Sequence, residues 1–228
     1  GKTLNPKVHC VIHPANRGAG IPDGGLFSAE QIKNLKTIPS STNPFLVQSP
    51  ARGVVEAKPL DEELTSTIRT LQVERYLKKY GLVLMTNFRA FALAGLDQVG
   101  KPQVLEEFSL ARSESEFWQL AAHPRKTEAE YGDSLFEFLR RVLLHNVPLT
   151  APQDLAEYLA SYAHEARLGM ERQAGIPALD SLRQALEEAL GLRFEGEKGE
   201  HFFRSTLVQT LFYGIFSSWV LWSRQPGA

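Results

Sequence analysis

The sequence predicts an α/β protein, and three observations carry that prediction. Short segments rich in Val and Ile, several bounded by Gly or Pro, recur through the first 120 residues and are typical of strands. A segment with apolar residues at helical spacing separates two of these strands. Beyond Pro124 every long segment has helical spacing. We therefore expect an α/β domain over residues 1–122 and an all-helical region over residues 123–228.

The individual elements follow from the same patterns. Gly81 is expected to end the helix that follows Pro59, because glycine commonly stops helices. The prolines and serines of residues 38–52 indicate a loop. We expect strands over residues 7–13, 21–27, 53–58, 82–86, 90–94 and 108–111. We expect helices over residues 61–80, 113–122, 128–145, 152–173, 179–190 and 200–222.

Composition excludes several classes of protein. Cys10 is the single cysteine, so neither an internal disulfide nor a Cys-rich zinc site can form. A reducing cytoplasm is the simplest location. No apolar leader is visible in residues 1–6. The most apolar stretch, residues 207–222, is shorter than the roughly 20 residues that cross a membrane. We expect it to be a buried helix, and we expect no membrane association.

Charge is distributed unevenly along the chain. The net charge is −1, which alone argues against a large nucleic-acid footprint. Residues 1–100, however, hold 12 Lys and Arg against 8 Asp and Glu, whereas residues 101–228 hold 13 against 18. A surface that binds phosphate is therefore expected in the first half.

Three charged residues in that half suggest a reactive site. Glu56 and Lys58 are two apart on an apolar strand, so their side chains share one face. Asp23 follows Pro22, beside another predicted strand. Taken singly, a turn aspartate and a solvated charged pair are ordinary alternatives. If the strands meet, however, the two carboxylates repel unless a cation joins them. Mg²⁺ is suited to one or two carboxylates completed by water.

The following helix offers two more candidates. Gln72 and Tyr76 are one turn apart and lie on the same side of that helix. Ile68, one turn earlier, gives this side a partly apolar character. The alternative, a glutamine without a role at the margin of the helix, stays open.

In this order, Pro22-Asp23, Glu56-Ala57-Lys58 and Gln72 to Tyr76 resemble the PD-(D/E)xK nuclease superfamily, in its RecB-like QxxxY branch. The wider sequence resembles the N-terminal nuclease region of single-chain restriction–modification enzymes with a downstream adenine-N6 methyltransferase. This resemblance covers roughly residues 10–120, and it reaches the helical part only through Gln209-Thr210-Leu211-Phe212-Tyr213-Gly214.

The resemblance implies a restriction-endonuclease-like mixed sheet flanked by helices. Residues 1–122 would be the nuclease domain, and residues 123–228 a helical linker towards a methyltransferase domain. Asp23, Glu56 and the Ala57 carbonyl would hold Mg²⁺, for which Mn²⁺ would substitute. Lys58 would orient the attacking water or stabilise the transition state, and Gln72 and Tyr76 would support the site or touch DNA.

The implied partners are double-stranded DNA and the methyltransferase and target-recognition domains of the same parent protein. Dimerisation on DNA is a further hypothesis, because a double-strand break usually needs two sites. Among the basic residues of the first half, Arg52, just before the strand of Glu56, is the preferred phosphate contact. Arg17 and Arg75 are further candidates for DNA contacts.

A second hypothesis is a catalytically inactive nuclease-like module that grips DNA and couples domains. Many members of the superfamily carry a helical Glu before the first strand, and residues 1–6 do not supply one. Gly24 and Gly25 after Asp23 also add flexibility to the site. The intact Asp23, Glu56 and Lys58 favour the catalytic hypothesis. Metal binding distinguishes the two.

Overall fold

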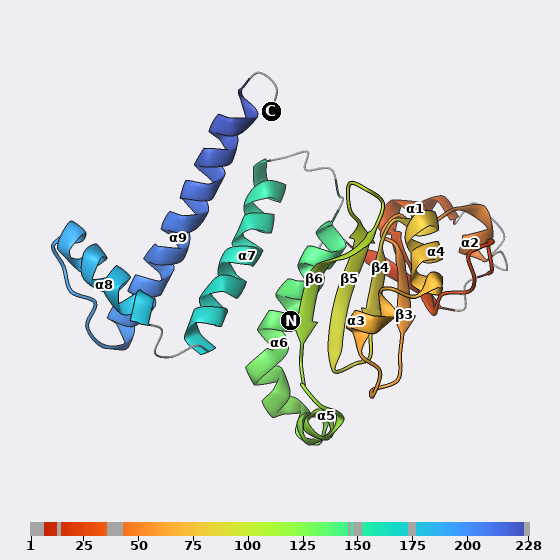
Figure 1. Cartoon of the computed structure of the whole chain (residues 1–228), viewed down its shortest axis with the longest axis horizontal. Helices are drawn as coiled ribbons and strands as arrows, with labels where there is room; N and C mark the ends of the chain where they lie inside the picture. Colours follow the sequence, from red (N-terminus) through yellow and green to blue (C-terminus); the bar gives the residue numbers. More distant parts are fainter. Residues whose placement is uncertain are drawn as a thin grey trace. The chain divides into compact units, whose positions relative to one another are not determined.

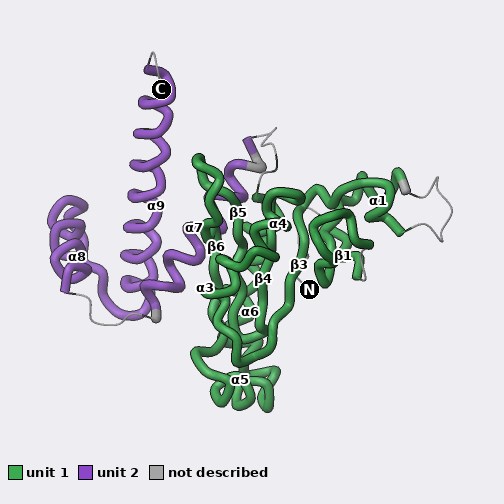
Figure 2. Tube along the Cα trace, turned by 45° about the vertical axis from the view of Figure 1, so that its right-hand side comes forward, with its two compact units in different colours: residues 1–148 green, residues 149–228 purple. Residues whose placement is uncertain are grey.

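A computed structural model describes residues 7–12, 15–35, 43–145, 147, 152–172 and 177–225. The chain divides into two compact units, Gly1–Pro148 and Leu149–Ala228 (Figure 2). The candidate site residues all lie in the first unit.

The first unit is built on one six-stranded sheet (Figure 1). Its strands are β1 (Val8–Ile12), β2 (Gly24–Ser28), β3 (Val54–Ala57), β4 (Val83–Thr86), β5 (Ala90–Leu96) and β6 (Pro102–Ser109), and they lie in sequence order across the sheet. Neighbouring strands are antiparallel except β3 and β4, which are parallel. The predicted α/β class and mixed sheet are confirmed.

Helices cover both faces of this sheet. One apolar cluster joins Val54 and Val83 of the sheet to Tyr76 of α4 (Leu71–Tyr80). A second cluster joins Leu82 to Phe138 of α6 (Pro124–Leu144). Adjacent strand residues point to opposite faces, so Val83 in the first cluster and Leu84, packed against the second, place α4 and α6 on opposite sides of the sheet. The result is a three-layer arrangement with the sheet in the middle.

The packing of α6 moves the end of the first unit past the predicted boundary at residue 122. Phe138 and Val142 are almost completely buried, and both lie in the cluster formed with the sheet. An amphipathic helix has the same sequence pattern whether its apolar face packs on a sheet or on other helices. From the sequence alone, α6 was therefore assigned to the helical region.

Local structure departs from the predictions at three places. The predicted helix over residues 61–80 is two helices, α3 (Leu64–Thr67) and α4, because Thr70 caps α4 by accepting from the amide of Val73. Strand β6 begins at Pro102, six residues before its predicted start. Helices α1 (Ala29–Leu35), α2 (Pro44–Val47) and α5 (Glu114–Ala121) complete the unit, and only α5 was predicted. Residue 13 of the first predicted strand and residues 38–42 of the predicted loop lie outside the described residues.

The second unit contains α7 (Pro152–Arg172), α8 (Pro177–Leu190) and α9 (Gly196–Ser223). Phe203 and Leu207 of α9 pack with Phe194 in its small core. Among the residues that the structure describes, none covers the C-terminal half of α9 in this way, and Leu211, Ile215 and Trp219 are more than half exposed. The expectation that residues 207–222 are buried is therefore wrong for most of that stretch. Among the helices in the described parts of the chain, none has the length and apolarity needed to cross a membrane.

Candidate active site

Strand β3 carries the candidate site at its C-terminal end. Val54 is fully buried and packs beneath α4, so Glu56 and Lys58, two and four residues later, project towards the same helix. Gly53 directly precedes the strand with φ of 84°, and a Cβ there would collide with the Leu82 carbonyl. Glycine thus allows β3 to enter the sheet tightly against β4.

Asp23 is held against β3 by both its backbone and its side chain. Its amide donates to the Val55 carbonyl at 3.0 Å, and its Oδ2 accepts from the Ala57 amide at 2.7 Å. β2 begins only at Gly24, so the carboxylate extends the hydrogen-bond ladder by one position. The second oxygen, Oδ1, accepts no hydrogen bond from the described residues and remains open to a ligand.

Glu56 is the most buried charged group of the site, with 4% of its surface exposed. Its Oε1 accepts from Lys58 Nζ and from Gln72 Nε2, both at 2.9 Å. Its Oε2 is buried and has no hydrogen-bond partner among the described residues. A buried acceptor without a partner costs about 1–3 kcal/mol, and more if it is charged. This oxygen therefore has a strong physical reason to take a cation or a proton.

Helix α4 supplies the support for Glu56. Gln72 Nε2 also bonds the Tyr76 hydroxyl at 3.0 Å, so one amide nitrogen links the carboxylate to the phenol. Tyr76 is fully buried, and its hydroxyl lies 3.3 Å from where a Cβ would stand at Gly20. The Gln72 amide is thus held by a residue that is itself fixed in the core.

The electrostatics of the site match this geometry. Burial raises the pKa of Glu56, and the Asp23 charge adds to the rise, although Lys58 and Gln72 oppose it. Burial alone lowers the pKa of Lys58, but its hydrogen bond to Glu56 and the charges of Glu56, Glu62 and Asp23 outweigh that effect, so the pKa lies above its usual value. Lys58 therefore stays an ammonium at neutral pH. Burial likewise raises the pKa of Tyr76 and keeps its hydroxyl protonated.

The Ala57 carbonyl points to the same side of β3 as Asp23. The Lys58 amide donates to the Thr86 carbonyl of β4 at 2.8 Å. In a planar trans peptide the C=O of one residue points opposite to the next N–H. The Ala57 carbonyl therefore points away from β4, towards the Asp23 side.

These oxygen donors fit a hard divalent cation. Asp23 offers one open carboxylate oxygen, Glu56 offers one without a partner, and Ala57 offers its carbonyl. Mg²⁺ is commonly held by one or two carboxylates, with water completing an octahedron. The set contains no soft ligand, so it does not favour zinc or copper.

The arginines predicted to contact DNA differ in their exposure and in the charges around them. Arg75 is exposed on α4, next to Tyr76. The charge of Arg17 acts on Tyr80, the last residue of α4. Arg52 lies in the turn before β3, at the opposite end of that strand from Glu56. It is half-buried, and its charge interacts with Glu30. Arg75 is therefore the best exposed of the three.

Comparisons with protein-family models, with curated proteins and with solved structures find no match to this chain. Its candidate function therefore rests on its own sequence and geometry.

Sequence reasoning missed the residues that hold the segment after Lys58. Glu62 contributes its charge to the surroundings of Lys58, and Asn87 and Arg89 bind the backbone of the same segment. Asn87 and Arg89 lie 25 and 29 residues after the residues they bind, so no local sequence pattern indicates these contacts.

Proposed function

We propose that the first unit is a Mg²⁺-dependent nuclease module that hydrolyses phosphodiester bonds of double-stranded DNA. The observation that carries the proposal is the state of Glu56, whose Oε2 is buried without a partner among the described residues, while Lys58 and Gln72 hold Oε1. A Glu56–Lys58 ion pair with a purely structural role does not require the second carboxylate oxygen of Glu56 to be without a partner. A cation site beside the Lys58 ammonium does require such an oxygen.

In this proposal Asp23, Glu56 and the Ala57 carbonyl hold the cation, and Mn²⁺ substitutes for Mg²⁺. Bound there, the cation supplies Lewis-acid stabilisation of the phosphate and lowers the pKa of a water molecule. The Lys58 ammonium neutralises charge that develops on the phosphate oxygens and orients the attacking water. Gln72 holds Glu56 in position, and Tyr76 holds Gln72.

The reaction is a hydrolysis. Water adds to phosphorus, one ester P–O bond breaks, and a phosphate monoester and a hydroxyl remain. Arg75, Arg17 and Arg52 supply positive charge for the DNA backbone. Sequence choice would come from target-recognition and methyltransferase domains of a restriction–modification parent protein, and two copies would meet on DNA for a double-strand break. These partners are part of the proposal and rest on the resemblance of residues 10–120.

Plasmid cleavage with Mg²⁺ or Mn²⁺ tests the proposal. We expect wild type to cut and Lys58→Ala to lose at least about 100-fold in rate, as when one stabilising group of a transition state is removed. Lys78→Ala is the matched control, because Lys78 is also a lysine paired with a glutamate but is largely exposed on α4. Lys78→Ala should cut like wild type. Equal cleavage by Lys58→Ala and wild type would place the chemistry elsewhere.

The second hypothesis is a non-catalytic module that grips DNA. Within the described residues no group of three or more His, Cys, Asp and Glu side chains is placed to hold a metal. Calorimetric titration with Mn²⁺ decides between the two. A catalytic site binds Mn²⁺ in wild type and loses it in Glu56→Ala, whereas a DNA-gripping module binds DNA and takes no Mn²⁺ at Glu56.

A further inference from the structure

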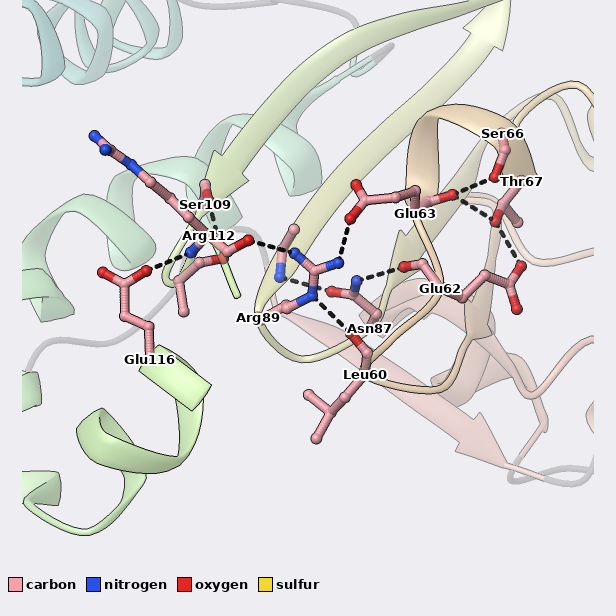
Figure 3. A network of polar contacts seen from close by, with 12 residues as sticks. Leu60, Glu62, Glu63, Ser66, Thr67, Asn87, Arg89, Ser109, Arg112 and Glu116 are labelled. Atoms are coloured by element: carbon pink, nitrogen blue, oxygen red, sulfur yellow. Dashed lines mark hydrogen bonds and ion pairs between the residues drawn. The ribbon is translucent and has the colours of Figure 1, made fainter. Parts of the chain in front are cut away.

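Arg89 lies in the turn between β4 and β5 and holds three separate points with its guanidinium (Figure 3). Nε donates to the Leu60 carbonyl at 2.6 Å, and one terminal nitrogen donates to Glu63 Oε1 at 2.5 Å. The other donates to the Arg112 carbonyl at 3.1 Å. Only 7% of Arg89 is exposed, so its guanidinium is shielded from water, although the Glu63 side chain that it binds is 68% exposed.

The backbone of Arg89 is itself fixed. Its carbonyl accepts from the amides of Leu110 and Ala111, at 2.8 and 3.0 Å, just after β6. Asn87 in the same turn accepts from the Ala90 amide at 2.8 Å and donates to the Glu62 carbonyl at 2.8 Å. The turn is therefore a rigid base from which two side chains reach the residues after β3.

Those residues follow Lys58 directly. The Lys58 amide is bonded to the Thr86 carbonyl, just before the turn. Within the turn, Asn87 binds Glu62, and Arg89 binds Leu60 and Glu63. Glu62 also accepts from Thr67 at 2.7 Å (Figure 3), and its charge acts on Lys58. The short segment of residues 58–63 thus contains both the backbone that carries Lys58 and a charge that acts on its ammonium.

We propose that Arg89 is a positioning residue for Lys58: its guanidinium clamps Leu60 and Glu63, and this clamp fixes the segment that carries the ammonium. Arg89 does not touch the reacting atoms. The catalytic consequence rests on the proposed nuclease function, whereas the clamp itself does not. An exposed ion pair of Glu63 alone would add little, but a planar guanidinium that bridges three acceptors adds geometry that a lysine cannot reproduce.

The test compares four forms of the full chain: wild type, Arg89→Lys, Glu63→Gln and Arg125→Lys. Arg125 lies exposed on α6 and serves as the matched control. Amide hydrogen exchange is followed by mass spectrometry over residues 58–66 and over β4 and β5. Steady-state plasmid cleavage with Mg²⁺ gives kcat and KM for the same four proteins.

We expect Arg89→Lys to speed exchange in residues 58–66 about tenfold, with β4 and β5 unchanged, and to lower kcat about tenfold with KM within a factor of about two, typical of losing a residue that orients another. Glu63→Gln keeps the bonds of Arg89 to Leu60 and Arg112, so its losses should be smaller. Arg125→Lys should match wild type.

The possible outcomes are distinct. Unchanged exchange over residues 58–66 in Arg89→Lys overturns the clamp. Faster exchange with unchanged kcat overturns the positioning role. If Arg89→Lys loosens β4 and β5 as well, Glu63→Gln decides, because a positioning role still requires a selective loss of kcat there. A wild-type chain that cuts no DNA overturns the proposed function and the catalytic consequence with it, while exchange still decides the clamp.

Discussion

Asp23 and Ala57 are joined by a hydrogen bond in which a carboxylate takes the place of a main-chain acceptor, with Asp23 Oδ2 2.7 Å from the Ala57 amide nitrogen. The same aspartate donates its own amide to the Val55 carbonyl. Asp23 thereby closes the end of the ladder between β2 and β3 and still presents a second oxygen. One residue serves both the sheet and the proposed cation site.

The two roles of Asp23 can be separated by substitution. Asp23→Asn keeps an acceptor for the Ala57 amide but removes the charge, so we expect near-normal stability and much weaker Mn²⁺ binding. Asp23→Ala removes both, and should also lower the free energy of unfolding by about 1 kcal/mol. Urea unfolding and calorimetric Mn²⁺ titration measure the two effects. Tight Mn²⁺ binding by Asp23→Asn would exclude this carboxylate as a ligand.

Glu56 should give the metal-free protein a distinctive dependence on pH. Its pKa is raised by burial in the folded state, so the folded protein binds a proton more tightly than the unfolded chain. Stability therefore falls as pH rises from the ordinary carboxyl pKa through the raised one. Glu56→Gln should be more stable than wild type at neutral pH, and this advantage should vanish in acid. Thermal unfolding with EDTA at a series of pH values from acid to neutral measures it.

The ionisation of Glu56 should affect cleavage in the opposite sense to stability, since cleavage should fall as the pH falls. A cation needs the ionised form of Glu56, so activity should be lost as pH falls through its raised pKa. High Mn²⁺ should shift that loss to lower pH, because the cation competes with the proton. A cleavage profile that does not respond to Mn²⁺ concentration would argue against Glu56 as a ligand.

The link from Gln72 to Tyr76 predicts a graded response. Gln72→Met removes the bond to Glu56 while keeping the length of the side chain, so cleavage should fall about 10-fold or more. Tyr76→Phe leaves that bond intact and removes only the hydroxyl, so the loss should be smaller. Cleavage rates at saturating Mg²⁺ compare the two. A larger loss in Tyr76→Phe would mean that the hydroxyl acts on the substrate directly.

Substitution of two glycines with left-handed backbones distinguishes the cost of backbone strain from the cost of a steric clash. Gly53 and Gly81 have φ of 84° and 79°, but a Cβ at Gly53 would collide with the Leu82 carbonyl, while a Cβ at Gly81 would meet no atom within 4 Å. Gly81→Ala should cost about 1 kcal/mol. Gly53→Ala should cost more than about 2 kcal/mol, since it would also push β3 away from β4. Urea unfolding of both variants measures the difference, and equal costs would show that β3 tolerates the shift.

The sequence predicted the central strands well because their signals are local. Val54, Val83 and Leu93 lie in short apolar runs bounded by Gly, Pro or Asn. β6 was mostly missed because Gln103, Glu106 and Glu107 make it polar, as suits a strand at the edge of a sheet. The break between α3 and α4 was missed because one cap, made by Thr70, decides it.

The candidate site was predictable as a set of residues, but its contacts were not. Spacing alone placed Glu56 with Lys58 and Gln72 with Tyr76, and the structure brings all four into hydrogen-bonded contact. Asp23 lies more than 30 residues before Glu56, and its bond to the Ala57 amide follows only from strand pairing. Arg89 could be named as a basic residue, but its hold on Leu60 depends on a turn that no local pattern encodes.

The antiparallel register of β2 and β3 keeps the proposed site apart from the connection between these strands. Gly24 lies opposite Val55, so β2 starts beside the site and runs away from it, and β3 returns to the site only at its end. Everything inserted between Ser28 and Val54 therefore leaves and re-enters the sheet at the far side. Lengthening a connection costs little free energy, since the closure entropy grows only logarithmically with length. This connection is thus a place where relatives of the chain, or a designer, can change the length of the protein and attach new recognition surfaces while the spacing of Asp23 and Glu56 stays constant.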